Sequence, residues 1–181
     1  MEQDKKKLFD ILKKNAFFRE KITLSSGKQS DYYLDARRVT LSPQGAYLCA
    51  KIILAMIQDD CVDAIGGPTL GADSIVGAVA ALSFEAQKPV NAFIVRKAPK
   101  PYGKQQQVEG PLLEKNMNVV LFDDVATTGK SIIESLEVLK KMGIMAKKAI
   151  CIVDREEGAR EALRAVDCEL VSIFTAREFL K

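Results

Sequence analysis

The chain has 181 residues, with 27 basic and 24 acidic side chains, a net charge of +3 and no histidine. This length fits one α/β domain covering residues 1–181, and the small net charge excludes a nucleic-acid coat or a membrane-surface protein. The lack of histidine excludes serine–histidine and cysteine–histidine nucleophilic catalysis and zinc sites built on imidazole. No stretch approaches the ~20 apolar residues of a transmembrane helix. We therefore expect a cytoplasmic protein with neither nucleic-acid nor membrane partners.

Apolar periodicity divides the chain into helices and short strands. The charged first segment, through about Lys14, has helical spacing and lacks the apolar centre of a signal peptide. Further helices are expected at about 43–58, 72–84, 131–142 and 157–165, with Pro43 in a first turn and Gly143 at a helix end. Strands are expected at 32–34, 62–65, 90–95, 118–122, 148–153 and 169–174, with residues 66–68 breaking the second and no usable periodicity over 96–111.

This alternation of strands and helices sets the fold class. Helical crossovers between strands predict an α/β fold with a mainly parallel sheet and helices on both faces. Such sheets bind ligands at the carboxyl ends of their strands. We therefore expect the functional residues to follow the strands directly.

Four cysteines, Cys49, Cys61, Cys151 and Cys168, are widely spaced and contain no CxxC pair. The first three lie in apolar runs, where a free thiol behaves as a small hydrophobic side chain. We expect buried thiols rather than disulfides or metal ligands.

Residues 118–131 (NVVLFDDVATTGKS) carry the strongest chemical signal. An apolar strand delivers Asp123 and Asp124 to its end, and Thr127-Thr128-Gly129 then turns into a helix. A turn at a helix amino end presents unpaired N–H groups and a positive dipole end, which suits a phosphate. Because two carboxylates would repel a phosphate, they are expected to face sugar hydroxyls or a Mg²⁺ ion. A nucleotide P-loop is excluded, because Asp124 stands where that motif needs its first glycine.

This order of strand, acidic pair and Thr-Thr-Gly turn resembles the phosphoribosyl-pyrophosphate (PRPP) signature of type I phosphoribosyltransferases. The resemblance implies their fold, in which a small hood, here about residues 1–40 plus C-terminal residues, accompanies the sheet. It also implies that the turn holds the 5′-phosphate of PRPP while the two acids contact ribose hydroxyls. The residues implied to bind PRPP are Asp123, Asp124, Val125, Ala126, Thr127, Thr128, Gly129, Lys130 and Ser131. The alternative is an ordinary strand–turn–helix with an exposed acidic pair.

Three further segments resemble the orotate phosphoribosyltransferase family in the same chain order, and together the segments span nearly the whole sequence. Residues 23–33 are similar to the family's substrate hood. This similarity implies that Ser25 lies near PRPP and that Tyr32 and Tyr33 help to wall the orotate pocket. For each tyrosine the alternative is a core aromatic side chain after a plain turn.

The second segment, residues 96–104 (RKAPKPYGK), resembles the family's basic lid, which reaches into the site of the partner subunit. Arg96, Lys97 and Lys100 are therefore expected to neutralise the departing pyrophosphate, with Lys100 as a catalytic residue. Tyr102 stands where family members commonly carry histidine. A tyrosine still donates a hydrogen bond to a phosphate but carries no positive charge at neutral pH. The alternative is a solvated basic loop.

The third segment follows the strand at 148–153, where Arg155 resembles the family's orotate-binding arginine. A guanidinium fork suits a planar ligand with a carboxylate; the alternative is a surface salt bridge with Glu156 or Glu157. Residues 66–73 (GGPTLGAD) resemble the family's pyrophosphate loop, in which many members carry a lysine where this chain has Leu70. Any role of Leu70 is therefore expected to come from its backbone.

Together these resemblances imply the transfer of the phosphoribosyl group of PRPP to orotate, giving orotidine 5′-monophosphate and pyrophosphate in pyrimidine biosynthesis. They imply Lys100, Asp123 and Asp124 as catalytic residues and a homodimer that shares its lids. They imply Mg²⁺ as the cofactor, bound mainly through PRPP and without a direct protein ligand. Two alternatives are a related enzyme acting on a purine base and a PRPP-binding regulator that has lost turnover.

Overall fold

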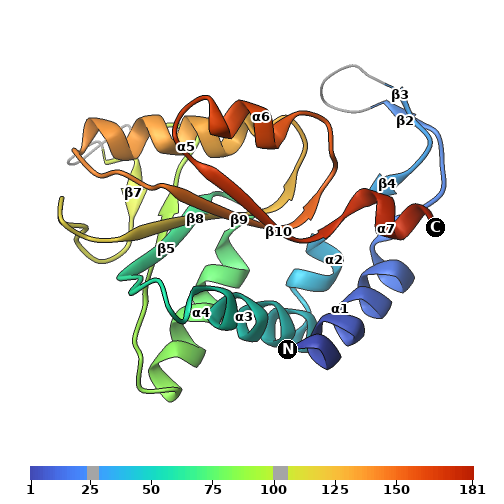
Figure 1. The fold of residues 1–181 in the computed structure, drawn as a ribbon, viewed down its shortest axis with the longest axis horizontal. Coiled ribbons are helices and arrows are strands. Elements are labelled where there is room, and N and C mark those ends of the chain that lie inside the picture. Colours follow the sequence, from blue (N-terminus) through green and yellow to red (C-terminus); the bar gives the residue numbers. More distant parts are fainter. Residues whose placement is uncertain (24–28, 100–105) are drawn as a thin grey trace.

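The computed structural model describes residues 1–23, 29–99 and 106–181, which fold around a six-stranded sheet of order β10–β9–β8–β5–β6–β7 (Figure 1). The strands are β5 (Ala64–Pro68), β6 (Asn91–Val95), β7 (Val108–Glu109), β8 (Val119–Ala126), β9 (Lys148–Asp154) and β10 (Glu169–Thr175). All neighbouring strands pair in parallel except β7, which pairs antiparallel with β6 at one edge. The predicted mainly parallel sheet is confirmed.

Helices cover both faces of this sheet. One face carries α1 (Glu2–Asn15), α2 (Arg37–Thr40), α3 (Pro43–Ile57) and α4 (Asp73–Glu85), and the other carries α5 (Lys130–Lys141) and α6 (Ala159–Arg164) (Figure 1). The alternation of side chains along each strand supplies a core to each layer. On β8, Val120 and Phe122 join the core beneath α3 and α4, while Val119 and Leu121 join the core beneath α5.

Local signals in the sequence explain several helix ends. Ser42 caps α3, because its hydroxyl oxygen accepts a hydrogen bond from the N–H of Gly45 at 3.1 Å, and Pro43 occupies the first turn as expected. Gly143 follows α5 with a φ of +77°, a left-handed conformation that ends a helix without strain at glycine.

A small unit built from both ends of the chain lies beside the sheet. It contains the antiparallel pairs β1 (Phe17–Phe18) with β4 (Tyr33–Leu34) and β2 (Ile22–Thr23) with β3 (Gln29–Ser30), together with α7 (Ala176–Leu180). Phe179 of α7 stacks on Phe9 and Phe17 with ring centroids 4.6 and 5.8 Å apart. These contacts join the N-terminal segment to α7, as expected of a hood; its boundary near residue 40 stays a prediction.

The expectation that residues 66–68 break the strand is wrong. Strand β5 continues through Gly66, Gly67 and Pro68 and pairs with β6 along its whole length. An added Cβ on Gly66 would overlap the carbonyl oxygen of Phe93, and one on Gly67 would overlap that of Phe122. The two glycines therefore let this central strand sit close to its neighbours instead of ending it.

Other differences concern strand length and one cysteine. Strand β8 extends to Ala126 and so includes the acidic pair, and β7 lies inside the stretch expected to lack structure. Cys49, Cys151 and Cys168 are buried free thiols, but Cys61 is exposed in a turn with a φ of +49°, so its expected burial is wrong.

Within the described ranges, no helix is both long and apolar enough to cross a membrane.

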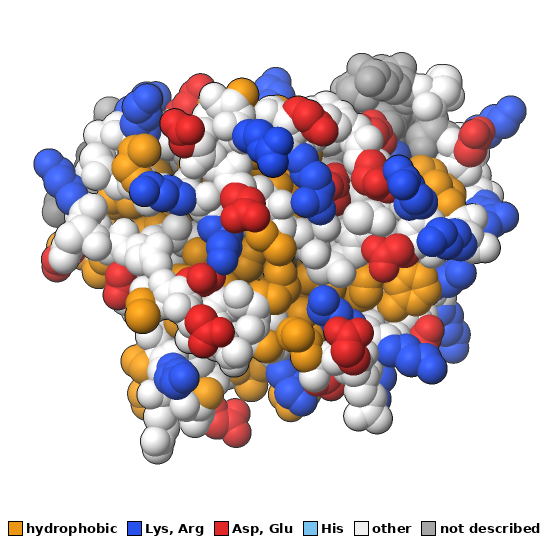
Figure 2. Space-filling model, viewed as in Figure 1, with side chains coloured by type: hydrophobic (Ala, Val, Ile, Leu, Met, Phe, Trp, Pro, Cys, Tyr) orange, Lys and Arg blue, Asp and Glu red, His pale blue; other side chains and the backbone are white. Residues whose placement is uncertain are grey.

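The surface seen in Figure 2 carries basic and acidic side chains in alternation, with apolar side chains gathered toward its middle. Charges of both signs are thus mixed over this face.

Gly67→Ala should destabilise the protein by about 3 kcal/mol or more, because the new methyl group would force β5 away from β8. The measurement is urea unfolding of both proteins. Gly77→Ala is the matched control: Gly77 is exposed on α4 with nothing within 4 Å of an added Cβ, so this change should stabilise by roughly 0.5–1 kcal/mol. A Gly67→Ala protein as stable as the wild type would contradict the close strand approach.

Candidate functional site

A pocket of about 400 Å³ lies where β5, β8 and β9 end. Larger hollows occur elsewhere, of about 600 Å³ beside α6 and about 680 Å³ between α3 and α4, but the 400 Å³ pocket contains the acidic pair and part of the predicted phosphate turn. Its walls are Tyr33, Leu34, Asp35, Ala36, Arg37, Pro68, Thr69, Leu70, Gly71, Lys97, Asp123, Asp124, Val125, Thr127, Ser131, Glu134 and Arg155. We call it the strand-end pocket.

Both acids line the strand-end pocket and face the loop at 69–71. An added Cβ on Gly71 would overlap the Oδ1 atoms of Asp123 and Asp124. Asp123 is only 6% exposed, and its Oδ2 accepts a hydrogen bond from the Ser131 hydroxyl at 2.6 Å. The N–H of Asp124 donates to Asp123 Oδ1 at 3.0 Å, and the N–H of Val125 donates to Asp124 Oδ1 at 2.8 Å. The carboxylates are thus held in place before any ligand arrives.

Burial raises the pKa of both acids. Burial, followed by repulsion from Asp124, raises the pKa of Asp123 to about 7, although the Ser131 hydroxyl opposes the shift. Burial also raises the pKa of Asp124, but the N–H of Val125 and the positive charge of Arg37 oppose that shift. The pocket therefore contains two neighbouring carboxyl groups whose negative charge is costly until a partner offsets it.

The turn after the acids presents unpaired backbone donors. Gly129, with a φ of +78°, precedes α5, and no side chain caps this helix. Among the described residues, none accepts a hydrogen bond from the backbone N–H groups of Thr128, Gly129 or Lys130. Open N–H groups at a helix amino end attract an anion. The sequence correctly predicted this arrangement next to the acidic pair.

Arg155 closes another side of the pocket and is only 7% exposed. Its N–H donates to the carbonyl of Ala126 at 2.8 Å, and its Nε donates to Glu157 Oε1 at 2.8 Å. The guanidinium also lies over the ring of Tyr32, 4.4 Å from the centroid. Burial raises the pKa of Tyr32, and the charge of Arg155 opposes that shift. The alternative for Arg155 was a surface salt bridge with Glu156 or Glu157. The salt bridge with Glu157 is present, but the arginine is buried and lines the pocket.

The remaining predicted site residues divide into four groups. Lys97 lines the strand-end pocket, as do Tyr33, Val125, Thr127 and Ser131. Arg96 lines an adjoining hollow of about 230 Å³ and pairs with Glu109 at 3.4 Å. Outside the pocket wall lie Tyr32, Ala126, Thr128, Gly129 and Lys130. Ser25, Lys100 and Tyr102 fall outside the described residues, and their roles stay predictions.

Sequence reasoning missed three charged residues of the pocket. Asp35 and Arg37 follow the short strand β4 and pair with each other, with Arg37 Nε 2.9 Å from Asp35 Oδ1. The hydrogen bond that Arg37 donates to Asp35 is the main cause that raises the pKa of Arg37. Glu134 joins the pocket one helical turn after Lys130, with which it pairs at 3.8 Å. The rule that functional residues follow strands would have found the first two, had it been applied to β4.

The loop at 69–71, expected to resemble a pyrophosphate loop, also lies in the pocket. The hydroxyl of Thr69 donates to Asp73 Oδ2 at 2.8 Å and so fixes the loop to the start of α4. Leu70 is 69% exposed, and its aliphatic side chain carries no group that could hydrogen-bond to the acids. The loop therefore faces the carboxylates mainly with backbone, in agreement with the expectation for Leu70.

Comparison with known proteins supports the family that this arrangement of the acids and the turn resembles. Residues 42–176 match the phosphoribosyl transferase domain family. The orotate phosphoribosyltransferase of Rhodopseudomonas palustris (strain BisB18) is 40% identical over 97% of this chain and 95% of its own length. The structure of Mycobacterium tuberculosis H37Rv orotate phosphoribosyltransferase with Fe(III) dicitrate superposes with a TM-score of 0.85 at 30% identity, covering 97% of this chain and 98% of that one. The same enzyme in complex with PRPP gives a TM-score of 0.81 at 28% identity, covering 98% and 99%.

The sheet, the acidic pair and the open turn are therefore those of a type I phosphoribosyltransferase. The match extends over nearly the whole chain, including the N-terminal unit that lies outside the family domain. The chain belongs to the orotate phosphoribosyltransferase family.

Asp123→Asn should raise the free energy of unfolding more at pH 8 than at pH 5. The folded-state pKa of Asp123 is about 7, whereas an unfolded aspartate titrates near pH ~4. Between these two pKa values the native protein keeps a proton that the unfolded chain has released, so stability falls as pH rises through that window and levels off above it. The wild type should therefore lose on the order of 3 kcal/mol of stability between pH 5 and pH 8, and the neutral asparagine should remove that loss.

The measurement is urea unfolding at both pH values. Asp10→Asn, which neutralises an exposed acid on α1, is the control for a general change in net charge. Equal effects of Asp123→Asn at pH 5 and pH 8 would contradict the raised pKa of Asp123.

Proposed function

We propose that this protein is an orotate phosphoribosyltransferase that transfers the phosphoribosyl group of PRPP to orotate, forming orotidine 5′-monophosphate and pyrophosphate in pyrimidine biosynthesis. One observation carries the proposal: a buried acidic pair, a turn with open N–H groups and a buried arginine meet around the strand-end pocket. These groups match, in order, a sugar diol, a phosphate and a planar ligand with a carboxylate. The relatives that bear this name support the choice of orotate over other bases.

The ribose and its 5′-phosphate would be held by β8 and the turn that follows it. Asp123 and Asp124 would accept hydrogen bonds from the vicinal hydroxyls, which explains why two like charges face one pocket. The N–H groups of Thr128, Gly129 and Lys130 would receive the phosphate, and the dipole of α5 favours that negative charge. The distance between acids and phosphate is then set by the chain itself, because the turn follows the acids directly.

The reaction breaks the bond between the anomeric carbon and the pyrophosphate oxygen and forms a bond from that carbon to N1 of orotate. Positive charge grows on the ribose ring while this bond breaks. The two carboxylates lie where they can stabilise that charge electrostatically. Lys97, in the wall of the pocket, would stabilise the departing pyrophosphate together with Arg96 and Lys100. No covalent nucleophile is needed, in keeping with a chain that has no histidine.

Arg155 would bind the carboxylate of orotate, and Tyr33 would wall the pocket beside it. A charge-assisted, forked hydrogen bond fixes both the position and the plane of such a ligand. Purine bases carry no carboxylate, so this contact favours orotate over a purine.

The carboxylate oxygens of the pocket are the kind of donor that Mg²⁺ prefers, but the ion would be bound mainly through the substrate. Among the described residues, no cluster of three or more acids or cysteines is arranged to hold a metal ion. Mg²⁺ is commonly bound through substrate phosphates with little help from the protein. The pyrophosphate of PRPP would therefore hold the ion, which would supply positive charge for the leaving group, while the acidic pair stays engaged with the sugar.

A homodimer and a cytoplasmic location complete the proposal. The homodimer rests on the resemblance of residues 96–104 to a lid that reaches the partner's site, and the location rests on composition. The purine-base enzyme and the PRPP-binding regulator are the alternatives that the assay below distinguishes.

The purified protein with Mg²⁺ and PRPP should consume orotate, but not adenine, guanine or hypoxanthine, as followed by orotate absorbance and chromatography of the nucleotide. Chelation of the metal should stop the reaction. Consumption of a purine instead would support the purine enzyme, and PRPP binding without consumption of any base would support the regulator.

Asp123→Asn combined with Asp124→Asn should lower kcat/KM at least about 100-fold while the protein stays folded, because both contacts to the sugar lose their charge. Activity and thermal unfolding are measured on the same preparation. Asp10→Asn should keep the wild-type rate. Normal turnover in the double variant would refute the role given to the acidic pair.

Lys100→Ala should lower kcat with little change in KM, because a lid acts on the transition state.

If the lid is shared, mixing this variant with the Asp123→Asn/Asp124→Asn protein should restore about one quarter of wild-type activity. Half of the dimers would then be mixed, and each mixed dimer contains one intact site out of two. Light scattering should give twice 19.9 kDa. A monomer, or no recovery after verified subunit exchange, would contradict the shared site.

A further inference from the structure

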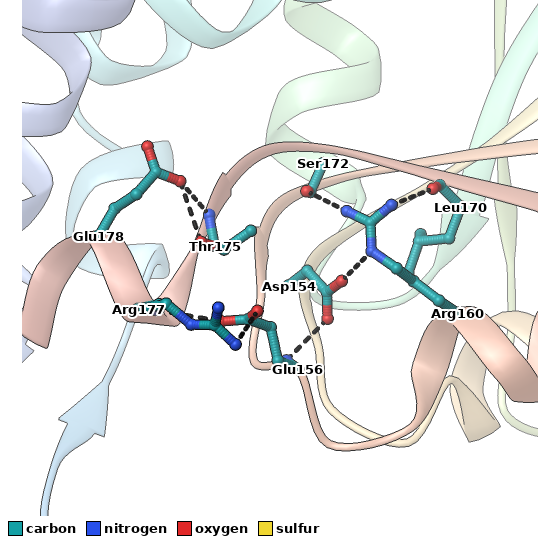
Figure 3. A network of polar contacts seen from close by, with 8 residues as sticks. All are labelled: Asp154, Glu156, Arg160, Leu170, Ser172, Thr175, Arg177 and Glu178. Atoms are coloured by element: carbon teal, nitrogen blue, oxygen red, sulfur yellow. Dashed lines mark hydrogen bonds and ion pairs between the residues drawn. The ribbon is translucent and has the colours of Figure 1, made fainter.

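Asp154 is a buried acid that lies next to Arg155 in the chain but contacts other groups. It ends β9, and its side chain is 1% exposed. Its Oδ1 accepts a hydrogen bond from the N–H of Glu156 at 2.9 Å, and its Oδ2 accepts one from Arg160 Nε at 2.6 Å (Figure 3). Both oxygens of this carboxylate are therefore used within the turn that carries Arg155.

Arg160 connects this turn to the edge of the sheet. Its three guanidinium nitrogens bind three different partners: Asp154, the carbonyl of Leu170 at 3.1 Å and the hydroxyl of Ser172 at 2.8 Å (Figure 3). Leu170 and Ser172 belong to β10, and Arg160 belongs to α6. A planar guanidinium with fixed donors is well suited to hold three elements in one geometry.

The backbone on both sides of Arg155 is held by this arrangement. The N–H of Arg155 is bonded to the carbonyl of Ala126, and Glu156 has a φ of +59°. A residue other than glycine adopts this left-handed conformation only where its surroundings fix it. Asp154 supplies that fixation through the N–H of Glu156, and Arg177 of α7 pairs with the Glu156 carboxylate at 3.1 Å (Figure 3).

We propose that Asp154 and Arg160 are positioning residues for Arg155, which set the place of its guanidinium and so the affinity for the carboxylate of the base without touching the substrate. This inference rests on the proposed function. The fold does not need a charged side chain at position 154 to hold β9 in place, because β9 already pairs with both β8 and β10. The ion pair instead fixes the turn of residues 154–158, and the only group of that turn in the strand-end pocket, among the described residues, is Arg155.

The test is a double-mutant cycle between Arg160 and Arg155. Arg160→Ala should raise the KM for orotate about tenfold, the effect of losing one charge-assisted contact, while kcat and the KM for PRPP change less than about twofold. Arg160→Lys, which keeps the charge and one donor, should fall between the two proteins. In an Arg155→Ala background, Arg160→Ala should cause no further loss of kcat/KM for orotate, because the residue it positions is gone.

Two further variants separate positioning from general damage. Arg164→Ala removes an arginine from the end of the same helix but outside the network, and it should keep the wild-type KM for orotate. Asp154→Asn should reproduce the effect of Arg160→Ala, with thermal unfolding measured in parallel. Because Arg160 is 48% exposed, its variants remain informative even if the buried Asp154→Asn protein does not fold.

The outcomes are distinct. Equal rises in the KM for orotate and for PRPP, or a further loss in the Arg155→Ala background, would show a structural role only and overturn the inference. An unchanged KM for orotate in Arg160→Ala, with an active wild type, would overturn the inference and leave the proposed function intact. A wild type that makes no orotidine 5′-monophosphate would overturn both.

Discussion

The burial of two adjacent carboxyl groups at the end of β8 is the constraint on which the rest of the site depends. Successive residues of a strand face opposite sides, yet Asp123 and Asp124 both reach the loop at 69–71, which can approach because Gly71 has no side chain. Like charges this close are costly in a poorly solvated place. The structure offsets part of that cost with the Ser131 hydroxyl, two backbone N–H groups and the charge of Arg37.

The burial that places these acids in the pocket also lowers the stability of the folded protein. A carboxyl group with a pKa raised to about 7 by burial weakens the folded protein above that pH, and a sugar hydroxyl or a nearby cation relieves the strain only when the ligand is bound. The hydrogen bond from Ser131 has a second consequence. Its proton is directed to Asp123. A phosphate bound at the turn, as proposed, would therefore meet the backbone N–H groups first and would gain the hydroxyl only if that hydrogen bond were broken.

The parts of the fold that the sequence predicted are those set by local patterns. Apolar runs of β6, β8, β9 and β10 and the periodicity of α3, α4 and α5 placed these elements within a few residues. The glycines of β5 were misread because their role is to admit the neighbouring strands, which depends on Phe93 and Phe122, far away in sequence. Strand β7 is too short to carry a pattern and is defined by its pairing with β6.

The site divides in the same way. The acids lie in the last part of β8, the Thr-Thr-Gly turn follows that strand, and Arg155 follows β9. They were predicted because parallel strands bring their carboxyl ends to one edge. Asp35 and Arg37 follow a strand as well, but β4 is only two residues long and was not used as a guide to the site. Glu134 was missed because it reaches the pocket through the rotation of α5, which no local motif reports. The same limit applies to Asp154, whose partners on α6 and β10 are brought to it only by the folded sheet.

The side of the pocket that Arg155 closes is supported by both ends of the chain. The ring of Tyr32 contacts both the guanidinium of Arg155 and the ring of Phe17, and Phe17 in turn contacts Phe179 of α7. The same helix pairs through Arg177 with Glu156, the residue after Arg155. A shift of α7 would therefore act on Arg155 by two routes, one through stacked rings and one through the ion pair. In the proposed function, the part of the pocket that would select the base therefore depends on both termini, whereas the residues proposed to bind sugar and phosphate lie in one continuous segment of the chain.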